Sequence, residues 1–425
     1  MEEKKIKVVW VCRVSNNELR KKLCFNNSCD VNNIKDRAKW NTNAINEFKK
    51  FTDIELHVIF PHTSISPELQ EFNLDGINFH IFRPEEDTFW FKFRRKIFKG
   101  KYETPDYNKN TSIIISLIND IKPDIVHYIG AENPEFSSSA LKVDKKYPLL
   151  ISLQTLMCDP EFKSNYPIND KMYNYRKNIE VNIIKKANFV CCISKHFKDT
   201  IKSTISDKIR FLNLSLAVGE NINTATSEKQ YDFVYYALDI NKAADWAIEA
   251  FAWAHERRPG ITLRIVGGYT TNTKLKFDKR LEELNIAENV TFSGSLPTHD
   301  DVIEEVRKAR FALLPLKIDL ISGTIREAMA NGLPIVTTVT PATPQLNVTR
   351  ESVLLSEKGD HKAMAENMLK LLDSKELVEK LKANAFATIK ERYDNASKIE
   401  CWHDAYFEII KHMNNGSPIS MEDNL

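Results

Sequence analysis

The sequence predicts an α/β protein with two parallel sheets, each covered by helices on both faces. Short apolar runs alternate with longer helical patterns along the 425 residues, which is typical of strand–helix–strand units in parallel sheets. The alternation starts again after about residue 220, behind a polar stretch at residues 215–230 that suits a linker. At ~100–200 residues per domain, the length accommodates two domains of similar size.

The first half of the chain contains apolar runs with the length and composition of buried strands, separated by amphipathic helical patterns. The strands are expected at residues 7–12, 54–60, 77–82, 124–129, 149–153 and 189–193, and helices at residues 36–51, 112–121 and 173–186.

The second half repeats this order and ends in three helical patterns. Strands are expected at residues 232–236, 262–266, 290–292, 311–315 and 334–338, and helices at residues 242–256, 274–284, 300–308, 324–331, 361–372, 375–392 and 396–412. We therefore predict an N-terminal domain at residues 1–218, a second at residues 219–395, and a final helix and tail at residues 396–425. Ligands of parallel sheets bind at the carboxyl ends of the strands, so the site is expected in a cleft between the two domains.

Composition excludes several classes of protein. Lys and Arg number 60 against 58 Asp and Glu, a net charge of +2, which argues against a dedicated nucleic-acid binder. No apolar run approaches the ~20 residues of a membrane span, and the short run at residues 7–12 is interpreted as a strand rather than a signal sequence. The seven cysteines lack metal-type spacing, which indicates reduced thiols in a cytoplasmic protein without a metal site.

The most informative stretch follows the strand expected at residues 311–315. There a loop leads through Ser322, Gly323 and Thr324 into a helix of strong helix formers. A glycine-centred turn at a helix N-terminus exposes unpaired N–H groups beside the positive end of the helix dipole, which suits a phosphate. The alternative is an ordinary connection in which Ser322 caps the helix and Gly332 ends it.

Two carboxylates accompany this turn, Asp319 in the loop and Glu327 one turn into the helix. Seven residues lie between them, and Ala-Met-Ala-Asn-Gly-Leu-Pro-Ile-Val follows the second. This pattern resembles the acidic-x7-Glu signature of the GT-B retaining glycosyltransferases of the family 4 group. The resemblance runs along nearly the whole chain and is strongest at residues 265–268, 290–294 and 313–315.

The resemblance implies a GT-B architecture, in which two Rossmann-like domains face a cleft and the C-terminal helix crosses back to the N-terminal domain. It implies that the second domain binds a nucleotide-diphosphate sugar as donor. Glu327 would hold the ribose hydroxyls, Asp319 would lie by the sugar, and backbone N–H groups around Ser322, Gly323 and Thr324 would contact the diphosphate.

Lys242 matches a family lysine whose charge balances the diphosphate leaving group, a task that needs a fixed cation because these enzymes generally work without a metal. No cofactor is therefore expected. The family's arginine five residues earlier is replaced by Ala237, and Arg326 or Lys317 could substitute for it. The alternative for Lys242 is a solvated lysine at a helix start.

Three glycines follow strands of the second half. Gly267 and Gly268 end one strand and Gly294 follows the next. In the family these loops line the pocket of the nucleotide base; the alternative is a pair of tight turns.

The first domain would bind the acceptor, and four polar residues near strand ends are the candidates. Arg13 could contact an anion. Glu132 lies past the end of its strand, Gln154 ends another, and His127 is either a cleft residue or a core histidine. Gln154 stands where many relatives have a histidine, and an amide cannot shuttle a proton.

Residues 89–102 contain six basic and six aromatic residues and no acid. Such a segment suits an anionic membrane surface or a lipid-linked acceptor. The alternative is a helix that packs its aromatic residues on the core and leaves its cationic face in solvent. The predicted membrane contacts are Trp90, Lys92, Arg94, Arg95 and Lys96.

The prediction is therefore a glycosyltransferase (EC 2.4) of cell-surface polysaccharide biosynthesis. Its expected partners are a nucleotide sugar and a glycan or lipid-linked acceptor, and no nucleic acid is expected. Retention of configuration is expected. One alternative is a catalytically weak sugar-nucleotide-binding or scaffolding protein, which the replacements at Ala237 and Gln154 favour. An epimerase or phosphorylase of the same fold is a further alternative.

Overall fold

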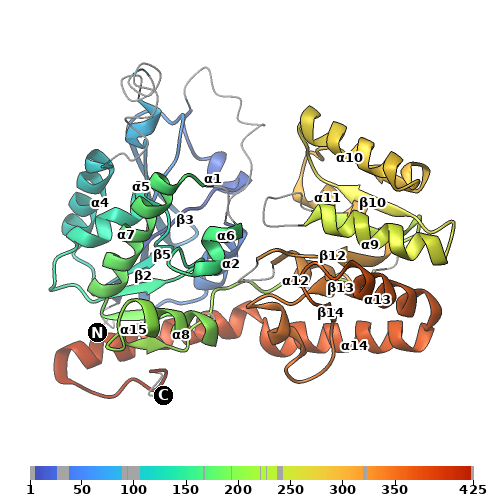
Figure 1. Cartoon of the computed structure of the whole chain (residues 1–425). Helices are drawn as coiled ribbons and strands as arrows, with labels where there is room; N and C mark the ends of the chain where they lie inside the picture. The colour runs from blue at the N-terminus through green and yellow to red at the C-terminus, as the bar shows by residue number, and fades with distance from the viewer. Residues whose placement is uncertain are drawn as a thin grey trace. The chain divides into compact units, whose positions relative to one another are not determined.

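The computed structural model describes residues 5–25, 38–88, 93, 106–165, 168–192, 194–220, 222–225, 227–236, 243–318 and 323–422. These residues form two compact units (Figure 1). The first is drawn from Met1–Ser164, Ile168–Val218 and Asn395–Leu425, and the second from Gly219–Asp394 with Asn165–Pro167.

The first unit contains an eight-stranded sheet with the order β3-β4-β2-β1-β5-β6-β7-β8. Every neighbouring pair is parallel except β3 and β4, which are antiparallel. The strands are β1 (Ile6–Val11), β2 (Ile54–Pro61), β3 (Leu69–Leu74), β4 (Ile77–Phe82), β5 (Ile125–Ile129), β6 (Leu149–Ser152), β7 (Phe189–Cys191) and β8 (Phe211–Leu212).

Helices connect these strands, and polar side chains cap several of them. Asn169 accepts a hydrogen bond from the N–H of Met172, and Ser194 accepts one from Phe197, so two helices begin at these residues. The helices of the unit are α1 (Asn17–Arg20), α2 (Lys39–Phe48), α4 (Asn108–Ile121), α5 (Pro134–Ser137), α6 (Pro160–Asn165), α7 (Asp170–Lys186), α8 (Lys195–Thr204) and α15 (Asn395–Asn415).

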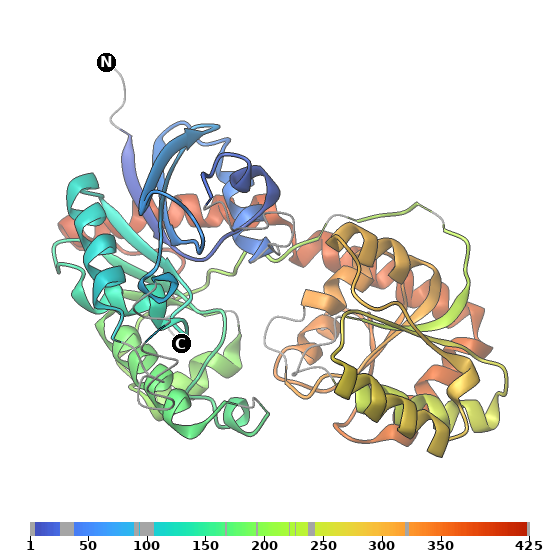
Figure 2. The same ribbon diagram turned by 90° about the horizontal axis from the view of Figure 1, so that it is seen from above.

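The last helix of the chain, α15, packs into the core of the first unit, although the rest of that unit comes from the first half of the sequence. Figure 2 shows this red helix beside the blue strands from the start of the chain. Trp402 and Tyr406 of α15 are fully buried. The Trp402 ring lies edge-on to that of Trp10 in β1 at 5.4 Å, and the Trp10 indole N–H donates to the Tyr406 hydroxyl at 2.7 Å. The C-terminal helix is therefore part of the first unit's core.

The second unit contains a six-stranded sheet with the order β11-β10-β9-β12-β13-β14, and all its pairs are parallel. The strands are β9 (Tyr231–Tyr236), β10 (Leu263–Val266), β11 (Val290–Phe292), β12 (Ala309–Leu314), β13 (Ile335–Thr338) and β14 (Leu354–Ser356). The helices are α9 (Ala244–Arg257), α10 (Thr271–Glu283), α11 (His299–Arg307), α12 (Gly323–Ala330), α13 (His361–Asp373) and α14 (Lys375–Arg392).

Alternate residues of the strands in the second sheet pack into two separate hydrophobic cores. Phe233 and Tyr235 of β9 pack with α9, α10 and α13, whereas Val234 and Tyr236 pack with α11, α12 and α14. Because side chains alternate between the faces of a strand, this division places helices on both faces of the sheet. The predicted α/β architecture is confirmed in both units.

The strands expected from the sequence are all present, with ends shifted by one or two residues. Three strands were not predicted: β3, β8 and β14. Within the residues that the structure describes, no helix combines the length and the apolar content that a membrane span requires.

Candidate functional site

The helix α12 is the next helix after β12, and it begins at the carboxyl edge of the second sheet. Its residue Thr324 is buried, and its carbonyl accepts a hydrogen bond from the hydroxyl of Tyr236, the last residue of β9. This bond fixes the start of α12 against the end of β9. The N-terminus of α12, with Gly323 as its first residue, therefore lies at the edge where ligands of parallel sheets bind.

Glu327 lies one turn into α12, close to His299 of α11 and to Tyr236 of β9. Its Oε1 lies 3.0 Å from Nε2 of His299, the first residue of α11, and its side chain is 15% exposed. Burial raises the pKa of the Tyr236 hydroxyl well above its ordinary value, and the negative charges of Glu327 and Glu220 raise it further. A carboxylate in this position can accept hydrogen bonds from the hydroxyls of a sugar.

The two glycine loops of the second unit contact each other. Gly267, with φ of +135°, forms an antiparallel bridge with Gly294, and its N–H donates to the hydroxyl of Ser293 at 3.2 Å. A Cβ atom at Gly268 would lie only 2.6 Å from Oγ of Ser295. The close approach of the two loops thus explains glycine at 267 and 268 without a ligand, while placing both loops at the carboxyl edge.

Three predicted donor-site residues, Lys242, Asp319 and Ser322, lie outside the described residues. Their roles stay predictions.

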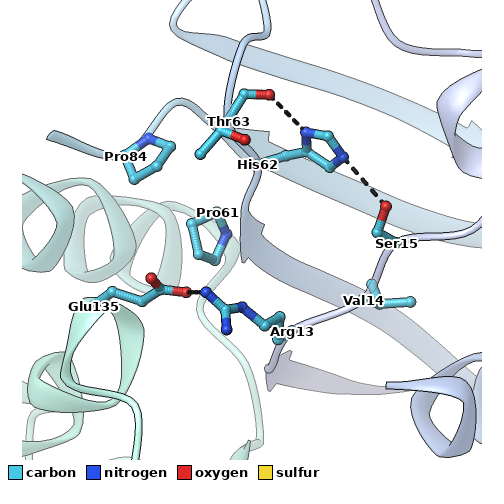
Figure 3. A pocket seen from close by; sticks show the side chains of 8 residues that line it. All are labelled: Arg13, Val14, Ser15, Pro61, His62, Thr63, Pro84 and Glu135. Atoms are coloured by element: carbon cyan, nitrogen blue, oxygen red, sulfur yellow. Dashed lines mark hydrogen bonds and ion pairs between the residues drawn. The ribbon is translucent and has the colours of Figure 1, made fainter. Parts of the chain in front are cut away.

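The carboxyl edge of the first sheet contains a small pocket with both charged and apolar walls, shown in Figure 3. It lies behind β1, β2 and β4, and its cavity volume is about 50 Å³. Such a volume holds a single polar group of a ligand rather than a whole sugar. The residues that line it are Arg13, Val14, Ser15, Pro61, His62, Thr63, Pro84 and Glu135.

Opposite charges meet in this pocket. The guanidinium of Arg13 forms an ion pair with Glu135 of α5, and the Arg13 carbonyl accepts from the Asn41 amide at 2.8 Å. Burial raises the pKa of the neighbouring Glu86 to about 7, and the charge of Glu135 contributes to this rise. The pocket therefore combines a fixed cation with the carboxylate of Glu135, and Glu86, which does not line the pocket, can hold a proton near neutral pH.

The imidazole of His62 lies across the pocket from this pair (Figure 3). Its Nε2 lies 3.3 Å from Oγ of Ser15, and its Nδ1 donates to the Thr63 carbonyl at 2.8 Å. The guanidinium of Arg20 also donates to Oγ of Ser15, at 3.1 Å. His62 is thus oriented by its neighbours, and both of its ring nitrogens lie within hydrogen-bond distance of protein atoms.

Glu132 and Gln154 lie together beside Gly130, which has φ of +103°. A Cβ at Gly130 would lie 3.2 Å from Oε2 of Glu132 and 3.4 Å from Cδ of Gln154. Glu132 is only 6% exposed, and burial raises the pKa of its carboxyl. The carboxyl of Glu132 is therefore covered, whereas Gln154 is half-buried, and the role of both residues at the acceptor stays a prediction.

His127 was expected either in the cleft or in the core, and the structure shows a core residue. It is fully buried, its Nδ1 lies 2.7 Å from the Tyr406 hydroxyl, and its Nε2 lies 2.8 Å from Oγ of Ser152. Burial lowers the pKa of the imidazole to about 3, so the ring is neutral near pH 7. Its assignment to the acceptor site is wrong, because neither ring nitrogen is available to a ligand.

The predicted membrane-contact residues Trp90, Lys92, Arg94, Arg95 and Lys96 lie outside the described residues. Their contact with a membrane stays a prediction.

The structure brings forward residues that the sequence did not indicate as site candidates: Ser15, His62, Glu135, Tyr236 and His299. For two of these residues, the position in the sequence at the end of a predicted strand could have indicated the site. His62 directly follows β2 and Tyr236 ends β9, so the rule that ligands bind at the carboxyl ends of strands points to both. Glu135 and His299 stand on helices, and only the folded chain places them beside Arg13 and Glu327.

Residues 220–388 match the family model described as Glycosyl transferases group 1. N-acetyl-alpha-D-glucosaminyl L-malate synthase of Bacillus anthracis is 22% identical over 217 residues, which are 51% of this chain and 55% of that protein. The chain thus matches about half the length of this curated relative.

Several solved structures resemble nearly the whole chain. Sucrose-phosphate synthase of Thermosynechococcus elongatus superposes with a TM-score of 0.69 at 14% identity, covering 95% of this chain and 99% of that chain. Anabaena HepE in complex with UDP gives a TM-score of 0.62 at 12% identity, covering 94% and 99%. Residues 220–388 are therefore similar to the glycosyl transferases group 1 family, and the chain has the GT-B fold.

Proposed function

We propose that the protein is a glycosyltransferase that moves a sugar from a nucleotide-diphosphate sugar to a hydroxyl of a glycan or lipid-linked acceptor. The observation that carries this proposal is the constellation at the carboxyl edge of the second sheet. The start of α12, Glu327 and the loops of Gly267 and Gly294 all lie at this edge, within the matched family domain.

Each part of this edge suits one part of the donor. The N–H groups at Gly323 and Thr324 stand at the positive end of α12, with Ser322 just before them, and suit the diphosphate. Glu327 suits the ribose hydroxyls, and the loops of Gly267, Gly268 and Gly294 suit the base. Asp319 would lie by the donor sugar.

The reaction breaks the bond between the sugar's anomeric carbon and the phosphate oxygen, and forms one to the acceptor oxygen. Negative charge develops on the diphosphate, and Lys242 with the N–H groups of α12 would stabilise it. In this scheme the acceptor oxygen attacks the face of the anomeric carbon from which the phosphate leaves, and the leaving phosphate takes the proton of the acceptor hydroxyl. No protein base is then needed, and the configuration is retained. Neither a metal nor another cofactor enters this scheme.

We assign the acceptor to the first unit. Its strand ends carry the pocket of Arg13, Glu135 and His62, and Gln154 beside Glu132. The name of the Bacillus anthracis relative includes L-malate, a carboxylate compound, and Arg13 is the group here that suits an anionic portion of an acceptor.

The experiment that tests the function is a screen of UDP-, GDP- and ADP-sugars. One of them is expected to raise the melting temperature by about 5 °C or more at saturating concentration, because a ligand that binds only the folded state stabilises it. UDP-sugars come first, since a similar structure contains UDP. The same donor should then be consumed when acceptor glycans are added, and failure of every donor to bind would overturn the proposal.

A second candidate is a sugar-nucleotide-binding protein with little activity. It is favoured by Ala237 and Gln154, which replace an arginine and a histidine of the family. Tight donor binding without hydrolysis or transfer, over the full acceptor panel, would identify this second function and exclude the first.

A role in cell-surface polysaccharide synthesis at the inner face of the membrane is the finer form of the proposal. The basic and aromatic composition of residues 89–102 supports it. Replacing Lys92, Arg94, Arg95, Lys96 and Lys99 by glutamine is expected to reduce binding to vesicles with anionic lipids by at least tenfold, since each basic residue contributes about 1 kcal/mol at such a surface. Unchanged vesicle sedimentation would contradict a membrane role for this segment.

A further inference from the structure

The second unit has a larger cavity at the opposite edge of its sheet. Lys229 stands just before β9, Arg310 near the start of β12, and Pro334 just before β13, so the cavity lies at the amino ends of the strands. Its volume is about 390 Å³, within the range of small-molecule sites. It is lined by Asn223, Thr224, Ala225, Ser227, Lys229, Arg310, Phe311, Asn331, Gly332, Pro334, Leu371, Leu372, Lys375, Val378, Glu379 and Lys382.

Positive charge predominates in this cavity, because four of its lining residues are basic and only Glu379 is acidic. The Lys229 ammonium donates to the carbonyls of Arg307 and Ala309 at 2.8 and 2.9 Å. Within the described part of the chain, Lys375 and Lys382 have no acid within ion-pair distance. These two cations are therefore available to an anionic ligand.

One face of α14 presents these lysines. Lys375, Val378, Glu379 and Lys382 recur at helical spacing and line the cavity together. Lys375 is the first residue of α14, whose cap Ser374 accepts from the N–H of Leu377 at 3.1 Å. The positive end of the helix dipole thus adds to the charge of the lysines.

The negative end of α12 also reaches the cavity, but hydrogen bonds satisfy its last carbonyls. The N–H of Asn223 donates to the Ala330 carbonyl at 2.8 Å, and the amide of Asn331 donates to the Glu327 carbonyl at 2.8 Å. The N–H of Gly332 donates to Met329 at 3.0 Å. The carbonyl groups of α12 therefore offset little of the positive potential.

The remaining wall of the cavity is apolar, formed by Leu371, Leu372, Val378, Phe311 and Pro334. A ligand that fills the cavity must cover this wall as well as pair with the lysines. Inorganic phosphate alone leaves it exposed to water, whereas an apolar group attached to the phosphate covers it.

We propose that this cavity binds a small organic phosphate that carries an apolar group, at a site separate from the carboxyl edge of the sheet. Lys375 and Lys382 pair with the phosphate, and Leu371, Leu372 and Val378 contact the apolar group. The site lies wholly within the second unit and does not depend on the function proposed for the carboxyl edge.

Calorimetric titration with phenyl phosphate tests the site. The protein with both Lys375→Gln and Lys382→Gln is expected to bind at least tenfold more weakly than the unchanged protein, because two charge-assisted contacts are lost. The matched control carries Lys380→Gln and Lys390→Gln, the same change of charge on α14 at residues that do not line the cavity. It should bind within about twofold of the unchanged protein, and added salt should weaken binding.

Two further measurements separate this site from others. Phenol and inorganic phosphate should each bind more weakly than phenyl phosphate, and phenyl phosphate should slow hydrogen exchange at residues 222–229 and 375–382. Equal binding by the two double variants, phenol binding as tightly as phenyl phosphate, or no saturable binding at all would each overturn the proposal. Circular dichroism verifies that both variants are folded.

Discussion

Replacement of Glu327 by alanine is expected to weaken binding of the nucleotide-sugar donor by about 100-fold or more. The carboxylate accepts charge-assisted hydrogen bonds from the ribose hydroxyls in the proposed complex, and two such bonds together contribute about 3 kcal/mol or more. Calorimetric titration with the donor found in the screen measures the loss. Glu327→Gln should lose less, because the amide oxygen still accepts one hydrogen bond.

A matched control distinguishes this role from a general effect of charge. Glu304 is an exposed residue of α11, and Glu304→Ala should leave donor affinity unchanged. His299→Gln is expected to weaken binding by a smaller factor, since His299 lies 3.0 Å from the carboxylate and orients it. If Glu327→Ala is folded and binds the donor as the unchanged protein does, Glu327 does not hold the ribose.

The fold was predictable because buried parallel strands and amphipathic helices have different periods. Where a strand is apolar and bounded by polar turns, as β5 and β12 are, the sequence locates it within one or two residues. β3 was not predicted because it is a partly exposed, antiparallel edge strand, and its sequence Leu-Gln-Glu-Phe-Asn-Leu mixes polar and apolar residues. β8 and β14 were not predicted because strands of two or three residues are too short to show a pattern of apolar residues.

The residues of the candidate donor site were predictable only where they belong to one continuous segment of the sequence. Gly323, Thr324 and Glu327 belong to a single helix, so their spacing in sequence sets their spacing in space. The partners His299 and Glu135 come from other elements, and no local pattern indicates which helix start lies against which carboxylate. His127 was ambiguous for another reason: all five residues of β5 are buried, so polarity does not distinguish the two faces of that strand.

Replacement of Trp402 by alanine is expected to lower the free energy of unfolding of the first unit by about 3–5 kcal/mol, the usual cost of removing a large buried aromatic side chain. Trp402 is 1% exposed, its ring lies 4.8 Å from that of His127, and its indole N–H donates to the Ser215 carbonyl at 2.9 Å. The substitution leaves a cavity and an unpaired carbonyl between α15 and the strands. Native-state hydrogen exchange of amides in β1 and β5 measures the loss for this unit alone.

Two variants of the same helix identify the cause of the loss. Trp402→Phe keeps an aromatic ring but lacks the N–H, so it should cost less than alanine and still more than a surface change. Met413→Ala, at a residue of α15 that is 42% exposed, should cost less than about 0.5 kcal/mol. If Trp402→Ala lowers the free energy of unfolding by less than about 1 kcal/mol, α15 contributes little to the stability of the first unit. The packing of α15 against the sheet, which the hydrogen bond from Trp10 to Tyr406 indicates, would then be contradicted.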